Sequence, residues 1–431
     1  MALYSALYSG MSGLATNGLA MSIVGDNLAN LNTIGFKKSR ANFQDMLGFS
    51  VVGPGTESFV GRGSSVSEVE QVYTQGSFMN TGNGLDLAIT GSGFFVVNGS
   101  SNGMSGNFYS RDGQFHVDNN GNLVNTSNMI IQGYNANESG NISSALGDLN
   151  FSSSTAAAKA TAEIDIYANL DSSVDAIPAG FDVTDIDSTS NFSTTISVYD
   201  SLGAAHETTV YFTKTADNNW EWNAVADGGD LTGGTEGTPE VRASGTMSFT
   251  ADGELQSMAT TTSDFDFVGG STANQAIAFN FGDDIASGGT GLSGCSQYAS
   301  ASNTSYQSQD GYTVGELASV IVDADGVVTG MFSNGERKTM GQVAVAKFQG
   351  DGLRRLGGNI FSATTDSGEA VIGGANTGGR GSINANVLES SNVDLASEFG
   401  NMIVFQRAYQ ANSRTISTTD QMIQELLSLK R

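Results

Sequence analysis

Both ends of the chain carry apolar residues at helical spacing. A seven-residue repeat runs through residues 3–31 and a second one through residues 395–427. Such a repeat places apolar side chains along one face of a helix, so it predicts a long amphipathic helix at each end. The repeated positions are Leu7, Leu14, Met21 and Leu28 near the start, and Leu395, Met402, Tyr409, Ile416 and Ile423 near the end.

Four glycines interrupt the first of these predicted helices, at Gly10, Gly13, Gly18 and Gly25. Each costs about 1 kcal/mol of helix propensity relative to alanine, so the isolated helix is hard to stabilise. We therefore expect the two end helices to pair as a coiled coil and to form a polymer interface through the nine repeated positions. On this hypothesis the ends are disordered in the monomer and fold on assembly. An antiparallel helix pair that caps a monomer is the alternative.

Between the ends the apolar period changes from seven to two, which predicts antiparallel strands. The alternating segments are 85–97, 114–118, 194–200, 207–215, 245–255 and 318–332. Turn dipeptides accompany them, and their residue types tolerate the positive φ of tight hairpins. These dipeptides are Asn98-Gly99, Asn120-Gly121, Asp252-Gly253, Asp325-Gly326 and Asn334-Gly335.

Two stretches, 141–162 and 283–308, are poor in large apolar residues and rich in Ser, Gly and Ala, which is typical of linkers. The predicted fold class is therefore mainly β with α-helical termini, in which a second β domain is inserted into a first. The predicted domains are a terminal helical core (1–35 and 393–431), a connecting segment (36–75 and 360–392), a β domain (76–150 and 305–359) and an inserted outer β domain with flanking linkers (151–304).

Composition supports a turn-rich β protein of several domains. The chain has 431 residues, with 56 Gly, 3 Pro, 39% hydrophobic and 14% charged residues. Its net charge of −26 repels phosphate backbones and anionic lipids, so neither nucleic acid nor membrane insertion is expected. Residues 1–70 carry 4 basic and 5 acidic side chains and residues 390–431 carry 4 of each, so the middle holds −25. No Lys or Arg precedes Lys37, which predicts export without a cleaved signal peptide.

The sequence offers little catalytic chemistry. Cys295 is the single cysteine and forms no internal disulfide, while His116 and His206 lie in predicted strand and turn surroundings. No standard zinc, redox, acyl-transfer or nucleotide motif occurs, and Gly91-Ser92-Gly93 precedes a strand rather than a helix. We therefore expect neither enzyme activity, nor a cofactor, nor a metal site.

Two weaker candidates for ligand binding remain open. The acidic turns at 118–122, 227–230 and 323–326 resemble calcium loops, although Asp and Asn are also the usual residues of hairpin turns. Trp220 and Trp222 lie two residues apart on one face of a predicted strand. Their rings either stack on sugars or fill the core of a β domain, and the core is the favoured interpretation.

Four ordered blocks carry a family resemblance. Residues 5–45 resemble the N-terminus shared by bacterial flagellar rod and hook proteins, and 82–97, 109–134 and 381–431 are similar to later blocks of that family. Residues 150–310 match no family pattern that we name. The family pattern Ala-Asn-x-Asn-Thr-x-Gly-Phe-Lys stands here as Ala29, Asn30, Asn32, Thr33, Gly35, Phe36 and Lys37.

The resemblance implies a structural role in the flagellum. The large central insertion favours the hook over the distal rod: a subunit that polymerises into a flexible hollow tube and transmits torque as a universal joint. The implied partners are copies of the chain itself, the rod, the hook cap, the hook-filament junction and the type III export apparatus. The implied location is the extracellular flagellum. A distal rod protein, an exported acidic adhesin or surface-layer protein and, third, a secreted polysaccharide hydrolase are the alternatives.

The resemblance also suggests how charge is used. A hydrated acidic middle suits outer contacts that slide as a hook bends, because wet polar contacts exchange at small cost. Lys37, Lys38 and Arg40 form the one basic cluster near the start, and they either meet acidic surface on an adjacent subunit or solvate a helix end.

Overall fold

The computed structural model describes residues 2–53, 56–137, 139–151, 155–350 and 352–428, and for 2–3, 47–53 and 56–60 it describes the backbone alone. The chain folds into two compact units. The first unit comprises Met1–Ser154, Ala318–Met331 and Arg337–Arg431, and the second comprises Thr155–Leu317 and Phe332–Glu336. The second unit is thus inserted into the sequence of the first. Our four-part domain division remains a prediction.

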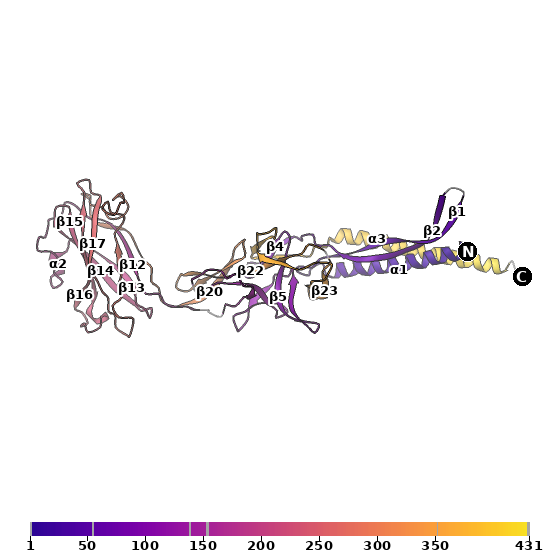
Figure 1. The fold of residues 1–431 in the computed structure, drawn as a ribbon, viewed down its shortest axis with the longest axis horizontal. Coiled ribbons are helices and arrows are strands. Elements are labelled where there is room, and N and C mark those ends of the chain that lie inside the picture. Colours follow the sequence, from indigo (N-terminus) through magenta and orange to yellow (C-terminus); the bar gives the residue numbers. More distant parts are fainter. Residues whose placement is uncertain (1, 54–55, 138, 152–154, 351, 429–431) are drawn as a thin grey trace. The chain divides into compact units, whose positions relative to one another are not determined.

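The two ends of the chain are long helices that pack together within the first unit. Helix α1 spans Ala2–Ala29 and helix α3 spans Leu395–Ser428, and they lie side by side in indigo and yellow in Figure 1. The expected fold class, mainly β with paired helical ends, is confirmed. In the described part of the chain no helix is both long and apolar enough to cross a membrane.

A long hairpin follows α1 where we expected only a connecting segment. Strands β1 (Ser39–Gly53) and β2 (Thr56–Gln71) pair antiparallel, with Ser39 opposite Gln71. Both strands contact α1. The polar and apolar residues of the hairpin alternate irregularly, and β-bulges shift the pairing register of its strands at three places. A search for strict alternation of polar and apolar residues therefore does not detect these strands.

The rest of the first unit is a β body. Its main sheet has the strand order β20-β21-β22-β9-β5-β6-β24-β23. Two short pairs, β3 with β27 and β4 with β26, join the strands before the sheet to those that lead into α3. The strands are β3 (Phe78–Asn80), β4 (Leu87–Thr90), β5 (Phe94–Ser101), β6 (Met104–Ser110), β7 (Phe115–Val117), β8 (Leu123–Asn125), β9 (Ile130–Asn135), β10 (Gly147–Asp148), β20 (Gly315–Val322), β21 (Val327–Phe332), β22 (Arg337–Lys347), β23 (Arg354–Gly357), β24 (Ile360–Ser362), β25 (Val371–Gly374), β26 (Ser382–Ala385) and β27 (Val387–Glu389).

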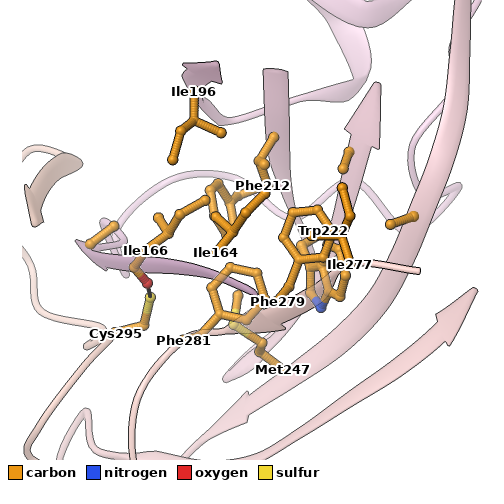
Figure 2. Packing of buried hydrophobic residues seen from close by; sticks show 14 of the residues in the cluster. Ile164, Ile166, Ile196, Phe212, Trp222, Met247, Ile277, Phe279, Phe281 and Cys295 are labelled. Carbon is orange, nitrogen blue, oxygen red and sulfur yellow. Dashed lines mark hydrogen bonds between the residues drawn. The ribbon is translucent and has the colours of Figure 1, made fainter. Parts of the chain in front are cut away.

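The second unit is built on a five-stranded antiparallel sheet in sequence order, β13-β14-β15-β16-β17, and a three-stranded sheet, β18-β12-β19. Aromatic side chains such as Phe212, Trp222, Phe279 and Phe281 fill its core (Figure 2). Its elements are β11 (Thr155–Ala156), β12 (Glu163–Asn169), α2 (Ile186–Thr189), β13 (Phe192–Tyr199), β14 (Ala205–Ala216), β15 (Asn219–Asp227), η1 (Gly228–Asp230), β16 (Pro239–Phe249), β17 (Leu255–Ser263), β18 (Ala278–Asn280) and β19 (Asn303–Gln309).

All six segments expected to contain strands do so, but one turn expectation is wrong. Asn98 and Gly99 lie inside β5, opposite Asn107 and Gly106 of β6. The turn falls at Asn102-Gly103, where both residues have positive φ, of 50° and 77°. The strand therefore continues through the first Asn-Gly pair, and the second one supplies the tight turn.

The stretch 283–308 is not an open linker. Cys295 lies in the core of the second unit, and its Sγ donates to the carbonyl of Ile166 over 3.4 Å (Figure 2). The amide of Ser296 donates to the carbonyl of Ala168. Residues 295–297 thus pack against the core and β12, and residues 303–308 belong to β19, although most side chains of the stretch are exposed.

Candidate functional site: the helix pair and its buried ion cluster

The helix pair meets through small residues of α1. A methyl group added at Gly10 would lie 2.9 Å from Cγ1 of Ile416, and one added at Gly13 would lie 2.5 Å from the side-chain amide of Asn412. Both distances are shorter than a normal van der Waals contact, so these glycines permit the close approach of α3. The close approach of the two helices therefore comes with a cost in helix propensity.

The buried face of α1 therefore differs from the face defined by the seven-residue repeat. Its buried positions are Gly10, Gly13, Thr16, Ala20, Val24 and Asn27. The repeat positions flank this face and do not form it. Leu7, Leu14, Met21, Leu28, Met402, Ile416 and Ile423 are half-buried, whereas Leu395 and Tyr409 are exposed. Of these nine residues, Ile416 lies against Gly10 and Tyr409 lies against Gly18 of α1. The role of all nine as a polymer interface remains a prediction.

Asn27 connects three elements at the end of α1. Its side-chain amide donates to the carbonyl of Ser39 in β1 over 2.8 Å and to Oε2 of Glu398 in α3 over 3.2 Å. Its Oδ1 accepts from the amide of Ser39 over 2.9 Å. Asn27 is 1% exposed and Glu398 is 3% exposed, so these bonds are made away from water. A buried polar node of this kind fixes the register of helix, hairpin and helix.

The family pattern forms the turn that ends α1. The amide of Thr33 donates to the carbonyl of Asn30, and the hydroxyl of Thr33 donates to Oδ1 of Asn30. Gly35 has a φ of +68°, and a methyl group there would lie 2.6 Å from the backbone at Arg111. Phe36 is 1% exposed beneath the guanidinium of Arg355. The pattern thus docks the end of α1 onto the β body, while Ala29 and Asn32 are exposed.

A buried ion cluster completes this junction. Nζ of Lys37 lies 2.6 Å from Oε1 of Glu389, and Nη1 of Arg111 lies 3.2 Å from Oε2 of the same carboxylate. The carboxylate also accepts from the amide of Gly76 over 2.8 Å. Lys37 donates to the carbonyl of Thr74, and Arg111 donates to the carbonyls of Ile89 and Gly91. The cluster joins the first, third and fourth of the resemblance blocks.

Two cations share one carboxylate in this cluster. Their attraction to it therefore offsets only part of the free-energy cost of removing the charges from water. Burial lowers the pKa of Lys37 below its ordinary 10.5, against the attraction of Glu389, and the charge of Arg111 lowers it further. Burial also lowers the pKa of Arg111, and Glu389 opposes that shift. Nearby opposite charge and hydrogen bonds stabilise the charged forms, whereas desolvation disfavours them.

The residues of the basic cluster form ion pairs within the chain. Lys37 is buried against Glu389, Nζ of Lys38 lies 3.6 Å from Oε1 of Glu398, and Arg40 pairs with Glu70 over 2.7 Å. Lys37 is therefore not a solvated residue, whereas the side chain of Arg40 is 63% exposed, and a contact with acidic surface on an adjacent subunit remains a prediction. Sequence reasoning did not identify Glu389, Arg111 and Glu398 as functional residues. Their one signal in the sequence is that each is a charged residue within a block that resembles the family.

The helix pair and the hairpin expose many large apolar side chains. Each is between 41% and 67% exposed. They are Tyr4, Tyr8, Met11 and Leu19 on α1, Phe43, Met46 and Val69 on the hairpin, and Leu395, Phe399, Ile403, Val404, Tyr409, Met422, Leu426 and Leu427 on α3. We call this set the apolar surface. Many exposed large apolar side chains on the same elements are typical of surfaces that bind other molecules.

The other candidate residues have structural surroundings. Trp220 and Trp222 are 1% and 0% exposed, so the core interpretation is correct and neither ring is available to a sugar. His206 is buried and stacks on Phe267 with ring centroids 4.2 Å apart, whereas His116 is exposed.

The acidic turns use their carboxylates locally. Oδ1 of Asp118 accepts from the amides of Asn120 and Asn122, and Oδ1 of Asp323 accepts from those of Asp325 and Val327. Among the described residues, no group of three or more His, Cys, Asp or Glu side chains is arranged to hold a metal ion.

Comparisons with known proteins match this chain along its whole length. It is 36% identical to the flagellar hook protein FlgE of Salmonella typhimurium over 433 residues, which covers 99% of this chain and 100% of that protein. It is also 36% identical to FlgE of Escherichia coli K12 over 434 residues, with 99% and 100% covered, and 35% identical to FlgE of Borreliella burgdorferi, with 98% and 99% covered. The chain belongs to the flagellar hook protein family.

Four family models match in the order of the sequence. Residues 7–37 match the flagella basal body rod protein, and 88–173 the flagellar hook protein FlgE/F/G D1 domain. Residues 169–312 match the flagellar basal body protein FlaE D2 domain, and 384–429 the flagellar basal body rod FlgEFG protein C-terminal. The resemblance based on the sequence blocks is confirmed, and residues 150–310, which matched no pattern we named, belong to the hook protein family too.

The fold has a solved counterpart. The crystal structure of Helicobacter pylori flagellar hook protein FlgE2 matches with a TM-score of 0.50 at 15% identity, covering 72% of this chain and 100% of that one. At this identity the match concerns the fold alone. The full-length matches to hook proteins favour the hook over the rod, adhesin and hydrolase alternatives.

Proposed function

We propose that this chain is a structural subunit of the bacterial flagellar hook, which polymerises into a flexible hollow tube and transmits torque from rod to filament. Its role is mechanical and not enzymatic. Membership of the hook protein family supports this proposal. Within the molecule, the apolar surface on α1, α3 and the hairpin is the observation that carries it.

The apolar surface provides the energy for assembly. Complete burial of a large apolar side chain stabilises by roughly 1.5–3 kcal/mol, so covering half-exposed ones contributes about 1 kcal/mol each. A contact of this kind between unlike faces of successive subunits repeats without closing and forms an open helical polymer. The nine repeat positions, half-buried or exposed in one chain, become further covered when neighbouring chains pack against them.

The helix pair orders with assembly in this proposal. The glycines of α1 weaken the helix, and its contact with α3 depends on small residues that bury little apolar area. Neighbouring subunits supply the missing burial. The acidic second unit, in contrast, has its own aromatic core and folds without neighbours, so it provides the hydrated outer contacts that slide as the hook bends.

The partners follow from this place in the flagellum. Besides copies of itself, the subunit meets the rod at one end of the hook and the hook-filament junction proteins at the other. The hook cap directs its addition at the distal end, and the type III export apparatus delivers it to the extracellular flagellum. Family membership and the matches to basal body rod models support these assignments.

Substituting Val404 by Asp tests the role of the apolar surface. Val404 is 61% exposed on α3, so a charge there leaves the intrachain helix contact intact and opposes only contacts with other subunits. Charges at the half-buried positions Leu14, Met21 and Met402 would disturb both the intrachain helix contact and the contacts with other subunits. Leu202→Asp is the matched control, since Leu202 is 58% exposed and lies in the second unit.

The readouts are negative-stain microscopy and sedimentation of purified, concentrated protein. We expect tubes from the wild type and from Leu202→Asp, and soluble protein from Val404→Asp. Tubes of normal length and stability from Val404→Asp would contradict the assignment of the interface. In dilute protein, far-UV circular dichroism and proteolysis test the ordering of the ends, because helical, protected ends in the monomer are incompatible with folding on assembly.

A further inference from the structure

A pocket in the first unit lies apart from the apolar surface. It is formed where the loop between β4 and β5 approaches the end of β22, and it encloses about 290 Å³. Its walls include Gly91, Phe94, Arg111, Lys347 and Phe348. Nothing in the proposed assembly uses it.

Two cationic side chains line the pocket, which is unusual in a chain of net charge −26. Arg111 forms the buried wall and belongs to the ion cluster, in which two cations share the single carboxylate of Glu389. The cluster therefore holds one positive charge in excess. Nε of Arg111 is buried and has no hydrogen-bond acceptor among the described residues.

Lys347 adds a second positive charge. It is half-buried at the end of β22, and no carboxylate in the described ranges lies within ion-pair distance of its Nζ. The other half-buried wall, Phe348, packs edge-on against Phe94 with ring centroids 6.0 Å apart. The guanidinium carbon of Arg111 lies 5.4 Å from the centroid of the Phe94 ring.

Aromatic walls strengthen the attraction of these cations for an anion. Apolar rings exclude water, and a charge interaction is stronger in a medium of low dielectric constant than in bulk water. A planar carboxylate fits between rings and accepts charge-assisted hydrogen bonds from Lys. It also supplies the negative charge that the ion cluster lacks.

We propose that this pocket binds a carboxylate group. A free small carboxylate and an acidic side chain of a second copy of the chain, which carries 44 Asp and Glu residues, share this chemistry. In the second case the pocket is a specific contact between subunits, separate from the apolar surface and sensitive to salt.

The test compares two charge-neutralising variants on the same strand. Lys347→Gln removes the cation of the pocket, and Lys338→Gln makes the same change of charge elsewhere on β22. Acetate is titrated into isotope-labelled full-length monomer, and the amide resonances of Ser92 and Gly93 are followed by NMR at constant ionic strength. We expect saturable shifts in the wild type and Lys338→Gln, and binding about tenfold weaker in Lys347→Gln, as loss of one charge-assisted hydrogen bond implies.

A second arm distinguishes the two sources of the carboxylate. The critical concentration for tube formation is measured for the same proteins by sedimentation, without acetate. A rise of about tenfold for Lys347→Gln but not for Lys338→Gln supports a carboxylate from a neighbouring copy. Acetate binding with unchanged assembly supports a free carboxylate as the ligand. Absence of saturable shifts together with equal critical concentrations would overturn the proposal, and it would leave the hook assignment untouched.

Discussion

The asymmetry of the buried ion cluster makes a quantitative prediction. Glu389→Gln leaves Lys37 and Arg111, which are 2% and 4% exposed, without their common carboxylate. Removing one partner of a buried ion pair destabilises by about 3–5 kcal/mol, because an uncompensated charge remains. Lys37→Met removes the cation in excess and leaves Glu389 bonded to Arg111 and to the amide of Gly76. We expect this variant to cost less than about 2 kcal/mol, the net value of one charge-assisted hydrogen bond.

Hydrogen exchange measured by mass spectrometry reports the stability of the first unit, in peptides that cover β4 and β5. The second unit provides an internal control, since both tryptophans of the chain, Trp220 and Trp222, lie in its core. Unfolding by urea followed through their fluorescence should therefore be the same in both variants. The double variant isolates the coupling between Lys37 and Glu389. If Lys37→Met lowers the stability as much as Glu389→Gln does, the reasoning from charge excess is wrong.

The pH dependence checks the same cluster in a second way. Burial holds the pKa of Lys37 below its ordinary 10.5, so between those two values the unfolded chain binds more protons than the folded one. The contribution of Lys37 to the free energy of unfolding of the first unit therefore rises with pH between those two values. Tyr109 acts in the opposite direction, because burial raises its pKa above 10.0. Comparing the wild type with Lys37→Met cancels the contribution of Tyr109, and the rise should disappear in the variant.

Three further predictions concern the helix pair and the core of the second unit. Gly25→Ala should stabilise the helix pair in tubes by about 1 kcal/mol, because no atom of the chain lies within 4 Å of the added methyl group. Gly13→Ala should instead lower the melting temperature of tubes, because its methyl group clashes with Asn412. Asn27→Asp, which places a second carboxylate beside buried Glu398, should destabilise the pair more than Asn27→Ala in the same melting assay. Burial raises the pKa of Cys295 from 9.0 to about 12, so the second unit should lose up to about 4 kcal/mol as pH rises through that window. Urea unfolding followed by tryptophan fluorescence at pH 8 and pH 11 should show a larger loss in the wild type than in Cys295→Ala, because the contributions of Tyr167 and Lys159, whose pKa values are also raised, are common to both proteins.

Periodicity predicts the elements of this chain better than their contacts. The seven-residue repeat locates both helices, and alternation locates strands such as β14 and β16. The repeat does not identify the buried face of α1, because a count of large apolar residues passes over Gly10 and Gly13. Close approach of two helices depends on the absence of side chains, which a hydrophobic pattern does not register.

Local sequence patterns do not predict the ion cluster either, for a different reason. Lys37, Arg111 and Glu389 come from three distant parts of the chain, and each looks like an ordinary surface charge in its own sequence. The family pattern singles out Lys37 and Gly35 as important without indicating a partner for either. Only the fold places β27, which ends at Glu389, beside the turn that follows α1.

The position of Glu389 near the end of the chain has a consequence for the order of folding. A polypeptide that emerges with its N-terminus first exposes Lys37 and Arg111 long before their shared anion arrives. Until then the end of α1 lacks the carboxylate that holds both cations at the β body, and a chain that stops short of residue 389 never acquires it. The junction can therefore form only in molecules that extend to residue 389.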